Sequence, residues 1–114
     1  MRKAVISDIH GNLEAFTSVL EDIQTQQVDG IVSLGDNIGY GADSEAVMTL
    51  IRDRKIPSVL GNHELVVKHP RFYKWFNPKL RKTLQKTFDY LSTESIAAIQ
   101  NMEPVLIHKK SRFV

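Results

Sequence analysis

Three short apolar runs, separated by segments of helical periodicity, constrain the fold of this chain more than any other feature. The runs cover residues 4–6, 31–34 and 58–60, and the last two end directly at a glycine. Short runs rich in β-branched side chains and bounded in this way are typical of buried strands. Strands that alternate with helices predict βαβ units, and therefore a parallel sheet with right-handed crossovers.

The intervening segments carry the apolar spacing of helices and residues that can begin them. Asn12 can cap a first helix, and either Asp43 or Ser44 can cap a second one that ends before Pro57. Helical spacing returns after residue 78, and Thr93 can cap a last helix. The apolar positions at helical spacing are Leu13, Phe16, Leu20 and Ile23; Val47, Leu50 and Ile51; Leu80, Leu84, Phe88 and Leu91; and Ile96 and Ile99.

A fourth apolar run at residues 105–107 follows Pro104 and reads as a last strand. We therefore predict an α/β fold with a mostly parallel sheet of about four strands and flanking helices. A chain of 114 residues has the size of one small domain, which we assign to residues 1–114.

The stretch from residue 65 to residue 78 departs from the alternation and is expected to be an irregular loop or a short helix. It holds four aromatic side chains, those of Phe72, Tyr73, Trp75 and Phe76. Because buried aromatic side chains dominate the area of protein cores, we favour core anchors over a substrate-binding wall for these residues.

Composition excludes several classes of function. The chain has no cysteine, so a disulfide framework, a zinc–thiolate site and a cysteine nucleophile are absent. Its net charge of +2 is mild, and its basic run from Lys79 to Lys86 is short, so nucleic acid is expected only as a substrate. No apolar run has the length of a membrane span or of a signal peptide, so we expect a cytoplasmic protein.

Metal-ligand and acid–base side chains follow every predicted strand. Because ligands bind at the carboxyl ends of the strands in an open parallel sheet, these side chains are expected to meet. In strand order they are Asp8 and His10, then Asp36, then Asn62 and His63, then His108.

The types and spacing of these side chains suit divalent metal ions. Asp8 and His10 are two residues apart, so in extended chain they point to the same face, and Asp36 can offer one oxygen to each of two ions. Oxygen and nitrogen ligands without sulfur suit Mn²⁺, Fe, Ni²⁺ or Zn²⁺ better than Ca²⁺. Two such ions clamp a phosphoryl group and lower the pKa of a bridging water, while His63 can protonate a leaving-group oxygen.

Each motif has a simpler explanation when it is taken alone. An Asp-x-His pair and a Gly-Asp turn occur by chance, Asn12 and Asn37 suit caps or turns, and His69 suits a solvated loop. The order of the motifs, each at a strand end, favours the metal site.

The chain resembles the calcineurin-like metallophosphoesterase family, and in particular its small prokaryotic phosphodiesterase branch. The resemblance rests on Asp8-Ile9-His10-Gly11-Asn12, Gly35-Asp36-Asn37, Gly61-Asn62-His63-Glu64, the segment 37–43, and His108 as a fourth element. It implies two divalent metal ions, with Mn²⁺ first, and a bridging hydroxide that attacks phosphorus. By the same resemblance, Asp8 and His10 bind the first metal, Asp36 bridges both, Asn62 and His108 bind the second, and the catalytic residues are His63 and Asp36.

The chain departs from the family pattern after His108. Lys109 and Lys110 follow where the branch has a small residue, and the later Gly-His-x-His element, which gives each metal one more histidine, is absent before Val114. We therefore read residues 1–114 as an incomplete domain and expect weaker metal binding. A sheet that lacks its second layer also predicts a homodimer or larger assembly that covers the exposed face.

The leading functional prediction is hydrolysis of a small phosphoester, a phosphodiester or a nucleotide. A phosphoprotein is the second choice of substrate, which would make the chain a protein phosphatase. The rival from another class is a catalytically weak or inactive module that keeps the fold and serves in binding or interaction.

Overall fold

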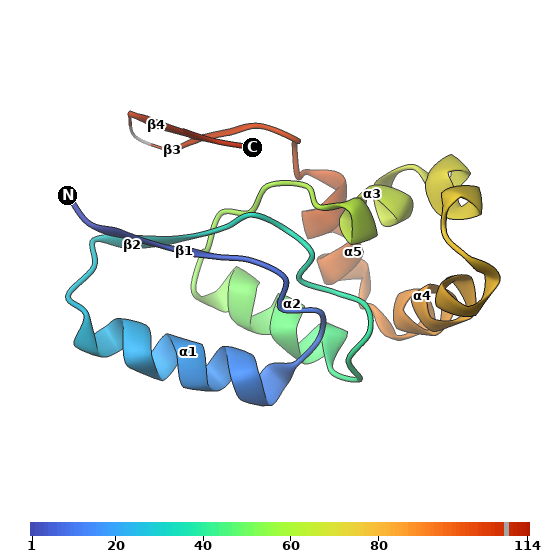
Figure 1. Ribbon diagram of the computed structural model, residues 1–114, viewed down its shortest axis with the longest axis horizontal. Coiled ribbons are helices and arrows are strands. Elements are labelled where there is room, and N and C mark those ends of the chain that lie inside the picture. The colour runs from blue at the N-terminus through green and yellow to red at the C-terminus, as the bar shows by residue number, and fades with distance from the viewer. Residues whose placement is uncertain (109) are drawn as a thin grey trace.

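A parallel pair of strands with helices on one side forms the frame of the molecule (Figure 1), and the computed structural model describes residues 1–108 and 110–114. Strand β1 (Lys3–Ile6) pairs with β2 (Gly30–Ser33) in parallel, from Lys3 beside Gly30 to Ile6 beside Ser33. Helix α1 (Leu13–Thr25) connects the two strands. The first predicted βαβ unit is therefore confirmed.

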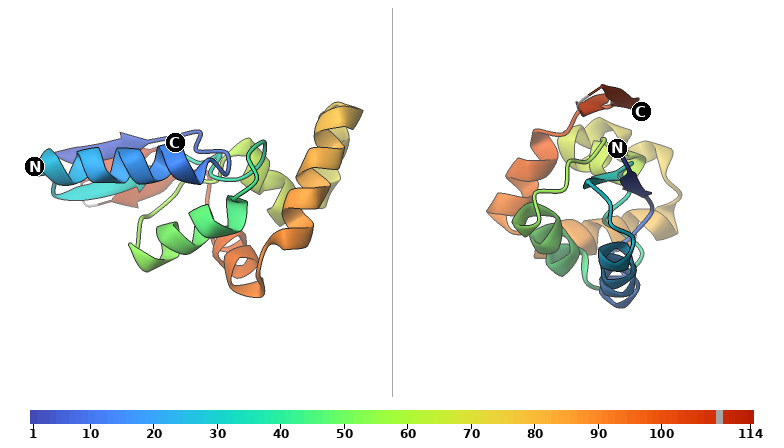
Figure 2. Two further views of the ribbon diagram at one scale, coloured as in Figure 1. Left: turned by 90° about the horizontal axis from the view of Figure 1, so that it is seen from below. Right: turned by 90° about the vertical axis from the view of Figure 1, so that its left-hand side faces the viewer.

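Helices α1 and α2 (Ser44–Asp53) lie on the same side of β1 and β2, as Figures 1 and 2 both show. As predicted, Asn12 caps α1, where its side chain accepts a hydrogen bond of 3.1 Å from the Ala15 amide. Asp43 is the N-cap residue of α2 but makes no side-chain cap bond. The buried apolar cluster beneath the strands contains Phe16, Leu20, Ile38, Val47, Met48, Ile51, Ile56, Leu91, Ile99 and Met102.

The parallel sheet is narrower than predicted. The segment after Pro57 joins it only through isolated bridges, from Ser33 to Ser58 and from Val59 to Glu103. The predicted fourth strand leaves the sheet altogether, because β3 (Leu106–His108) pairs antiparallel with β4 (Ser111–Phe113). This hairpin lies on the opposite side of β1 and β2 from α1 (Figure 2).

Pro104 accounts for the point of departure. The Glu103 carbonyl still accepts from the Leu60 amide at 2.9 Å, as in a continuing parallel ladder. The next residue is a proline, which has no N–H to donate to a neighbouring strand. The α/β class is thus confirmed. Within the part of the chain that the structure describes, the four predicted strands are found as one parallel pair, two isolated bridges and a separate hairpin.

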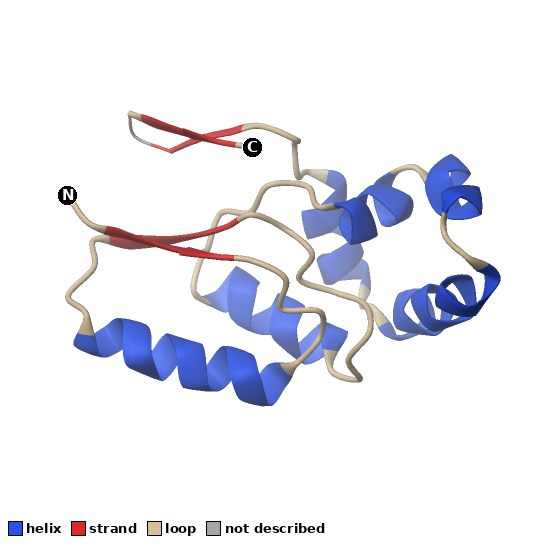
Figure 3. Ribbon diagram, viewed as in Figure 1, coloured by secondary structure: helices blue, strands red, loops and turns tan. Residues whose placement is uncertain are grey.

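The remainder of the chain is helical (Figure 3): α3 (Asn62–Lys68), the 3₁₀ segment η1 (Pro70–Trp75), α4 (Pro78–Tyr90) and α5 (Thr93–Gln100). The cap of α5 was predicted one residue too late, since Ser92, and not Thr93, accepts from the Ser95 amide at 3.1 Å. Among the described residues, none of the helices is long and apolar enough to cross a membrane.

The aromatic residues of η1 and its end do not fill the core, so the expectation of core anchors is wrong. No residue of η1 is buried, and the Trp75 side chain is 73% exposed. Phe76 turns toward His63 instead, with ring centroids 5.8 Å apart. Mostly aliphatic side chains from α1, α2 and α5 occupy the core, while Phe72, Tyr73 and Phe76 are half-buried outside it and Trp75 is exposed.

Glu45 joins the first turns of α2 and α5. Its carboxylate accepts hydrogen bonds from the Ser92 amide (2.9 Å) and the Ser95 hydroxyl (3.0 Å), and Arg52 lies 3.7 Å away. Partial burial raises the pKa of this carboxyl, but the hydrogen bonds and Arg52 outweigh it, so the net shift is downward from 4.5.

This depressed pKa predicts an acid-sensitive contribution to stability. A group with a lowered folded-state pKa stabilises the fold above its unfolded pKa and loses that contribution as the pH falls through the folded value. We expect Glu45→Gln to lower the melting temperature at pH 7 and to reduce its fall below about pH 4.5. Thermal unfolding from pH 3 to pH 8, followed by circular dichroism, measures both effects; parallel curves for the two proteins would contradict the assignment.

Candidate metal centre

Three of the predicted ligands converge where the parallel strands end. Asp8 and His10 follow β1, and Asp36 follows β2. One ligand atom from each residue lies within 4.8 Å of those of the other two. The carboxyl ends of two parallel strands thus bring together two carboxylates and an imidazole, as the sequence predicts.

Backbone hydrogen bonds continue the pairing of β1 and β2 into the loops that carry these side chains. The bonds join the amides of Asp8, His10 and Gly11 to the carbonyls of Gly35, Asp36 and Asn37, at 3.1, 2.9 and 2.9 Å. The following loop is attached in the same way, from the Gly41 amide to the His10 carbonyl (2.7 Å) and from the Asp43 amide to the Gly11 carbonyl (3.0 Å). The ligand loops are therefore fixed relative to one another by main-chain contacts.

The three ligands share an uncommon backbone conformation. Asp8, His10 and Asp36 have φ values of 59°, 48° and 55°, and Tyr40 beside them has 49°. Left-handed conformations are uncommon for residues other than glycine, although Asp and His adopt them more often than most. Such residues gather at functional sites, where the surrounding structure holds them in place.

The two ring nitrogens of His10 face different partners. Its Nδ1 atom lies 3.1 Å from the Ile38 carbonyl, and its Nε2 atom lies 3.3 Å from Oδ1 of Asp8. Without a cation, the imidazole can donate a hydrogen bond to either oxygen. With the Nδ1 proton on the Ile38 carbonyl, Nε2 would be free to bind a metal ion beside Asp8, and a backbone bond at the other ring nitrogen is usual for ligating histidines.

Asp8 is held as a carboxylate. The Ser7 hydroxyl donates to its Oδ2 at 2.5 Å, and this bond is the main cause that lowers the pKa of Asp8, with His10 adding to it. The side chain is 63% exposed, so it is open to solvent ions.

Asp36 is contacted by two residues at the start of α3. The His63 amide donates to its Oδ1 at 3.0 Å. The Asn62 amide group, with its nitrogen turned toward Asp36, donates to Oδ1 and Oδ2 at 3.0 and 2.6 Å. Asn62 thus lies beside the carboxylate, and its amide oxygen is the atom that a metal would use.

Glu64 is a buried carboxylate that the sequence did not single out. It is 0% exposed, and its two oxygens accept from the Asp36 amide (2.9 Å) and the Asn37 amide (2.7 Å). Burial raises the pKa of this carboxyl, while the two backbone bonds oppose the shift. Its place in the 61–64 motif was the one sequence signal that pointed to a role.

His63 is packed among aromatic rings at the edge of the cluster. Its ring centroid lies 4.6 Å from that of His10 and 5.0 Å from that of Tyr40. The residue is 2% exposed, and its buried Nδ1 atom has no hydrogen-bond partner among the described residues. Burial lowers the pKa of His63 below its ordinary value, with the neighbouring Asp36 carboxylate opposing the shift.

His108 is not brought to the cluster. Its carbonyl accepts from Lys3 Nζ at 2.7 Å, and its ring lies near Gly30, so it sits beside the amino-terminal ends of β1 and β2. Asp8, His10 and Asp36 lie at the opposite ends of these strands. β3 joins the hairpin rather than the parallel sheet, so His108 does not follow a strand of that sheet as predicted.

Gly39 makes room for His63. It has a φ of +93°, and a Cβ atom at this position would lie 2.1 Å from Nδ1 of His63. We expect Gly39→Ala to lower the free energy of unfolding by about 2–4 kcal/mol, because it combines backbone strain with overpacking. Chemical denaturation measures the loss.

Gly30→Ala is the matched control for this substitution. A Cβ atom there would meet nothing closer than His108 Cε1 at 3.7 Å, which is ordinary contact. Equal losses in the two variants would show that the His63 packing is not the cause.

Comparison with known proteins identifies the class that this site defines. The sequence matches the model of the calcineurin-like phosphoesterases over residues 1–112, so the chain belongs to this family. An uncharacterized protein of Methanocaldococcus jannaschii is 37% identical over 106 residues, which are 93% of this chain and 43% of that protein.

Two solved structures share the fold of this chain. A metallophosphoesterase from Sphaerobacter thermophilus has a TM-score of 0.76 and 34% identity, over 95% of this chain and 44% of that one. A hypothetical protein from Pyrococcus horikoshii has a TM-score of 0.84 and 20% identity, over 97% and 52% of the two chains. The chain therefore spans about half, or less, of the length of the proteins it matches.

Proposed function

We propose that the cluster at the ends of β1 and β2 is the metal site of a phosphoesterase that uses two divalent ions. The observation that carries this proposal is the convergence of Asp8, His10 and Asp36, all three in left-handed backbone conformations. Family membership supports a metal-dependent hydrolase acting on phosphoester bonds.

The donor set fits such ions. Asp8 and His10 would hold one ion, Asp36 would contact both, and Asn62 would contribute an amide oxygen to the second. Carboxylate, imidazole and amide ligands without sulfur match Mn²⁺ first, and also Fe, Ni²⁺ or Zn²⁺. When bound, two such ions neutralise phosphoryl oxygens and make water a better nucleophile at neutral pH.

The chain's own residues supply orientation and proton handling. The Ile38 carbonyl fixes the His10 ring, and the Glu64 carboxylate fixes the backbone beneath Asp36. His63 lies against the His10 ring and is proposed to face the leaving-group oxygen, where its ring N–H can donate a hydrogen bond or a proton. His108 is proposed as a ligand only in a conformation that returns its strand to the sheet.

The proposed substrate is a phosphodiester or a nucleotide, and a phosphoprotein is the alternative. The rival function is that of a binding module without turnover. The cluster is open to solvent, with Asp8 63% exposed, so a substrate can reach the metal ions directly.

Hydrolysis of bis-p-nitrophenyl phosphate and p-nitrophenyl phosphate with added Mn²⁺ tests the proposal. We expect turnover that Asp36→Ala abolishes, since this carboxylate lies against both Asn62 and the His63 amide. Asp53→Ala is the matched control, because it removes an exposed aspartate at the end of α2. A phosphopeptide in the same assay distinguishes the protein phosphatase.

The hydrolysis assay decides between the enzyme and the binding module. Activity lost in Asp36→Ala and kept in Asp53→Ala supports the enzyme. No turnover by any of the three proteins, together with no bound Mn²⁺ by equilibrium dialysis, would leave the binding module as the better account.

A homodimer is also proposed, on the ground of apolar surface near the hairpin. Val5 and Ile107 are 50% and 72% exposed. Burial of such side chains between two copies is favourable. Light scattering at increasing protein concentration is expected to show a dimer, and a clean monomer would count against it.

A further inference from the structure

We propose that a cavity binds the nucleobase of a nucleotide substrate. It lies between helix α4 and residues 40–46, which form the loop before α2 and the first turn of α2. This inference rests on the proposed function, because it places the group attached to the scissile phosphate. The cavity has a volume of about 750 Å³. Pockets for small ligands typically measure about 300–1,000 Å³, so a nucleoside fits.

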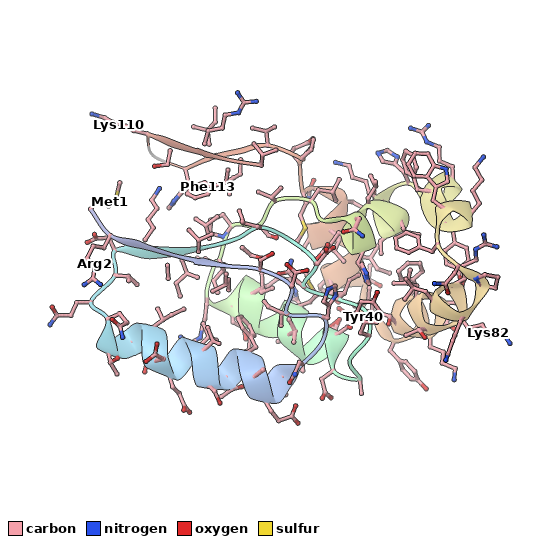
Figure 4. The ribbon with its side chains drawn as sticks, viewed as in Figure 1. Met1, Arg2, Tyr40, Lys82, Lys110 and Phe113 are labelled. Carbon is pink, nitrogen blue, oxygen red and sulfur yellow. The ribbon has the colours of Figure 1, made fainter. Side chains whose placement is uncertain are left out.

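The cavity adjoins the candidate metal centre through one shared residue. Tyr40 lines the cavity, and its ring centroid lies 4.8 Å from that of His10 and 5.0 Å from that of His63. Figure 4 places Tyr40 between the loops that carry the ligands and helix α4. A phosphate on the metal ions and a base beyond Tyr40 can therefore belong to one molecule.

The wall of the cavity is fixed relative to the metal ligands. The Gly41 amide donates to the His10 carbonyl, and the Asp43 amide donates to the Gly11 carbonyl. On the other side, α4 contributes Lys86 and Tyr90. Main-chain bonds thus hold the loop side of the cavity in place relative to His10.

The side chains of the cavity suit a planar, polar ring. Tyr40 and Tyr90 are 61% and 80% exposed, so both rings are available for stacking on a base. Lys86 forms no ion pair among the described residues and offers a cation to a phosphate or a ring acceptor. Asp43, whose side chain makes no cap bond, offers an acceptor to an exocyclic amino group.

The test compares two ligands that differ only in the base. Adenosine 5′-monophosphate and ribose 5-phosphate are titrated by calorimetry into the Mn²⁺-loaded chain and into the metal-free chain. We expect the nucleotide to bind about tenfold more tightly or better, since stacking of one base on an aromatic ring has an effect of that order. Tyr90→Ala should remove this preference and Tyr90→Phe should keep it.

Trp75→Ala is the control, because it removes another exposed aromatic ring, on η1 rather than in the cavity. Thermal unfolding confirms that each variant is folded. Equal binding of the two ligands, no binding of either, or a full base preference in Tyr90→Ala would overturn the proposal.

Hydrolysis of bis-p-nitrophenyl phosphate by the same samples separates this inference from the proposed function. A base preference without turnover would keep the cavity assignment and reject the phosphoesterase. Turnover without a base preference would support the phosphoesterase and reject the cavity assignment.

Discussion

Replacement of Glu64 by glutamine is expected to weaken Mn²⁺ binding about 10- to 100-fold, which is the usual effect of removing a group that supports a metal ligand. In Glu64 each carboxylate oxygen accepts one backbone N–H, from Asp36 and from Asn37. A glutamine can accept only one of them and turns its own N–H₂ toward the other. The Asp36 backbone, which is in a left-handed conformation, then loses part of what holds it. Equilibrium dialysis or Mn²⁺ electron paramagnetic resonance measures the affinity.

Glu45→Gln is the matched control for this substitution. Like Glu64, Glu45 is a carboxylate that accepts a backbone N–H, in this case that of Ser92, although it is only partly buried. It joins α2 to α5 rather than the loops that carry Asp8, His10 and Asp36. Both variants should lose stability, by about 1–3 kcal/mol for each unpaired buried group. Only Glu64→Gln should lose Mn²⁺ affinity when binding is measured well below the melting temperature. An equal loss of affinity in both variants would reduce Glu64 to a general structural residue.

Replacement of His63 by asparagine is expected to lower kcat by about 10²- to 10⁴-fold, the usual contribution of a positioned proton donor. The side chain does not belong to the Asp8, His10 and Asp36 cluster, so Mn²⁺ affinity should change little. Steady-state kinetics with bis-p-nitrophenyl phosphate, beside a Mn²⁺ titration, measure the two quantities. The result separates an enzyme from a binding module, because a module keeps its ligand and has no turnover to lose.

His69→Asn provides the comparison for His63. His69 is exposed and contacts only the Phe72 ring among its described aromatic neighbours, at 6.3 Å. Its replacement should leave both kcat and Mn²⁺ affinity unchanged. If His63→Asn behaves in the same way, the histidine serves only to fill space beneath Tyr40.

Local signals in the sequence predicted the first half of the molecule well. The side chain of Asn12 caps α1, and Phe16 and Leu20 lie in the core as their spacing indicates. The predicted ligands Asp8, His10 and Asp36 meet because parallel strands end at one edge of a sheet.

Features that depend on distant partners were not predictable in the same way. The apolar run at residues 105–107 has the character of a strand, but its sequence does not say which strand it pairs with. Here Pro104 and the pairing with β4 place it in the hairpin rather than in the sheet of β1 and β2. Trp75 looked like a core residue because of its size, yet the space it would need is filled by aliphatic side chains. The 61–64 motif includes Glu64, but only the folded chain shows that its carboxylate accepts from the backbone of Asp36.

The main-chain attachment of the ligand loops has a consequence for protein engineering. The loops after β1 and β2 are joined by amide–carbonyl bonds, which do not involve the side chains of Asp8 and His10. Both positions are left-handed, so donors that tolerate this conformation, such as Asn, Asp and His, are the exchanges that should keep the scaffold intact. A series of variants at these two positions would turn the chain into a small platform on which preference among Mn²⁺, Ni²⁺ and Zn²⁺ can be set by choice of ligand.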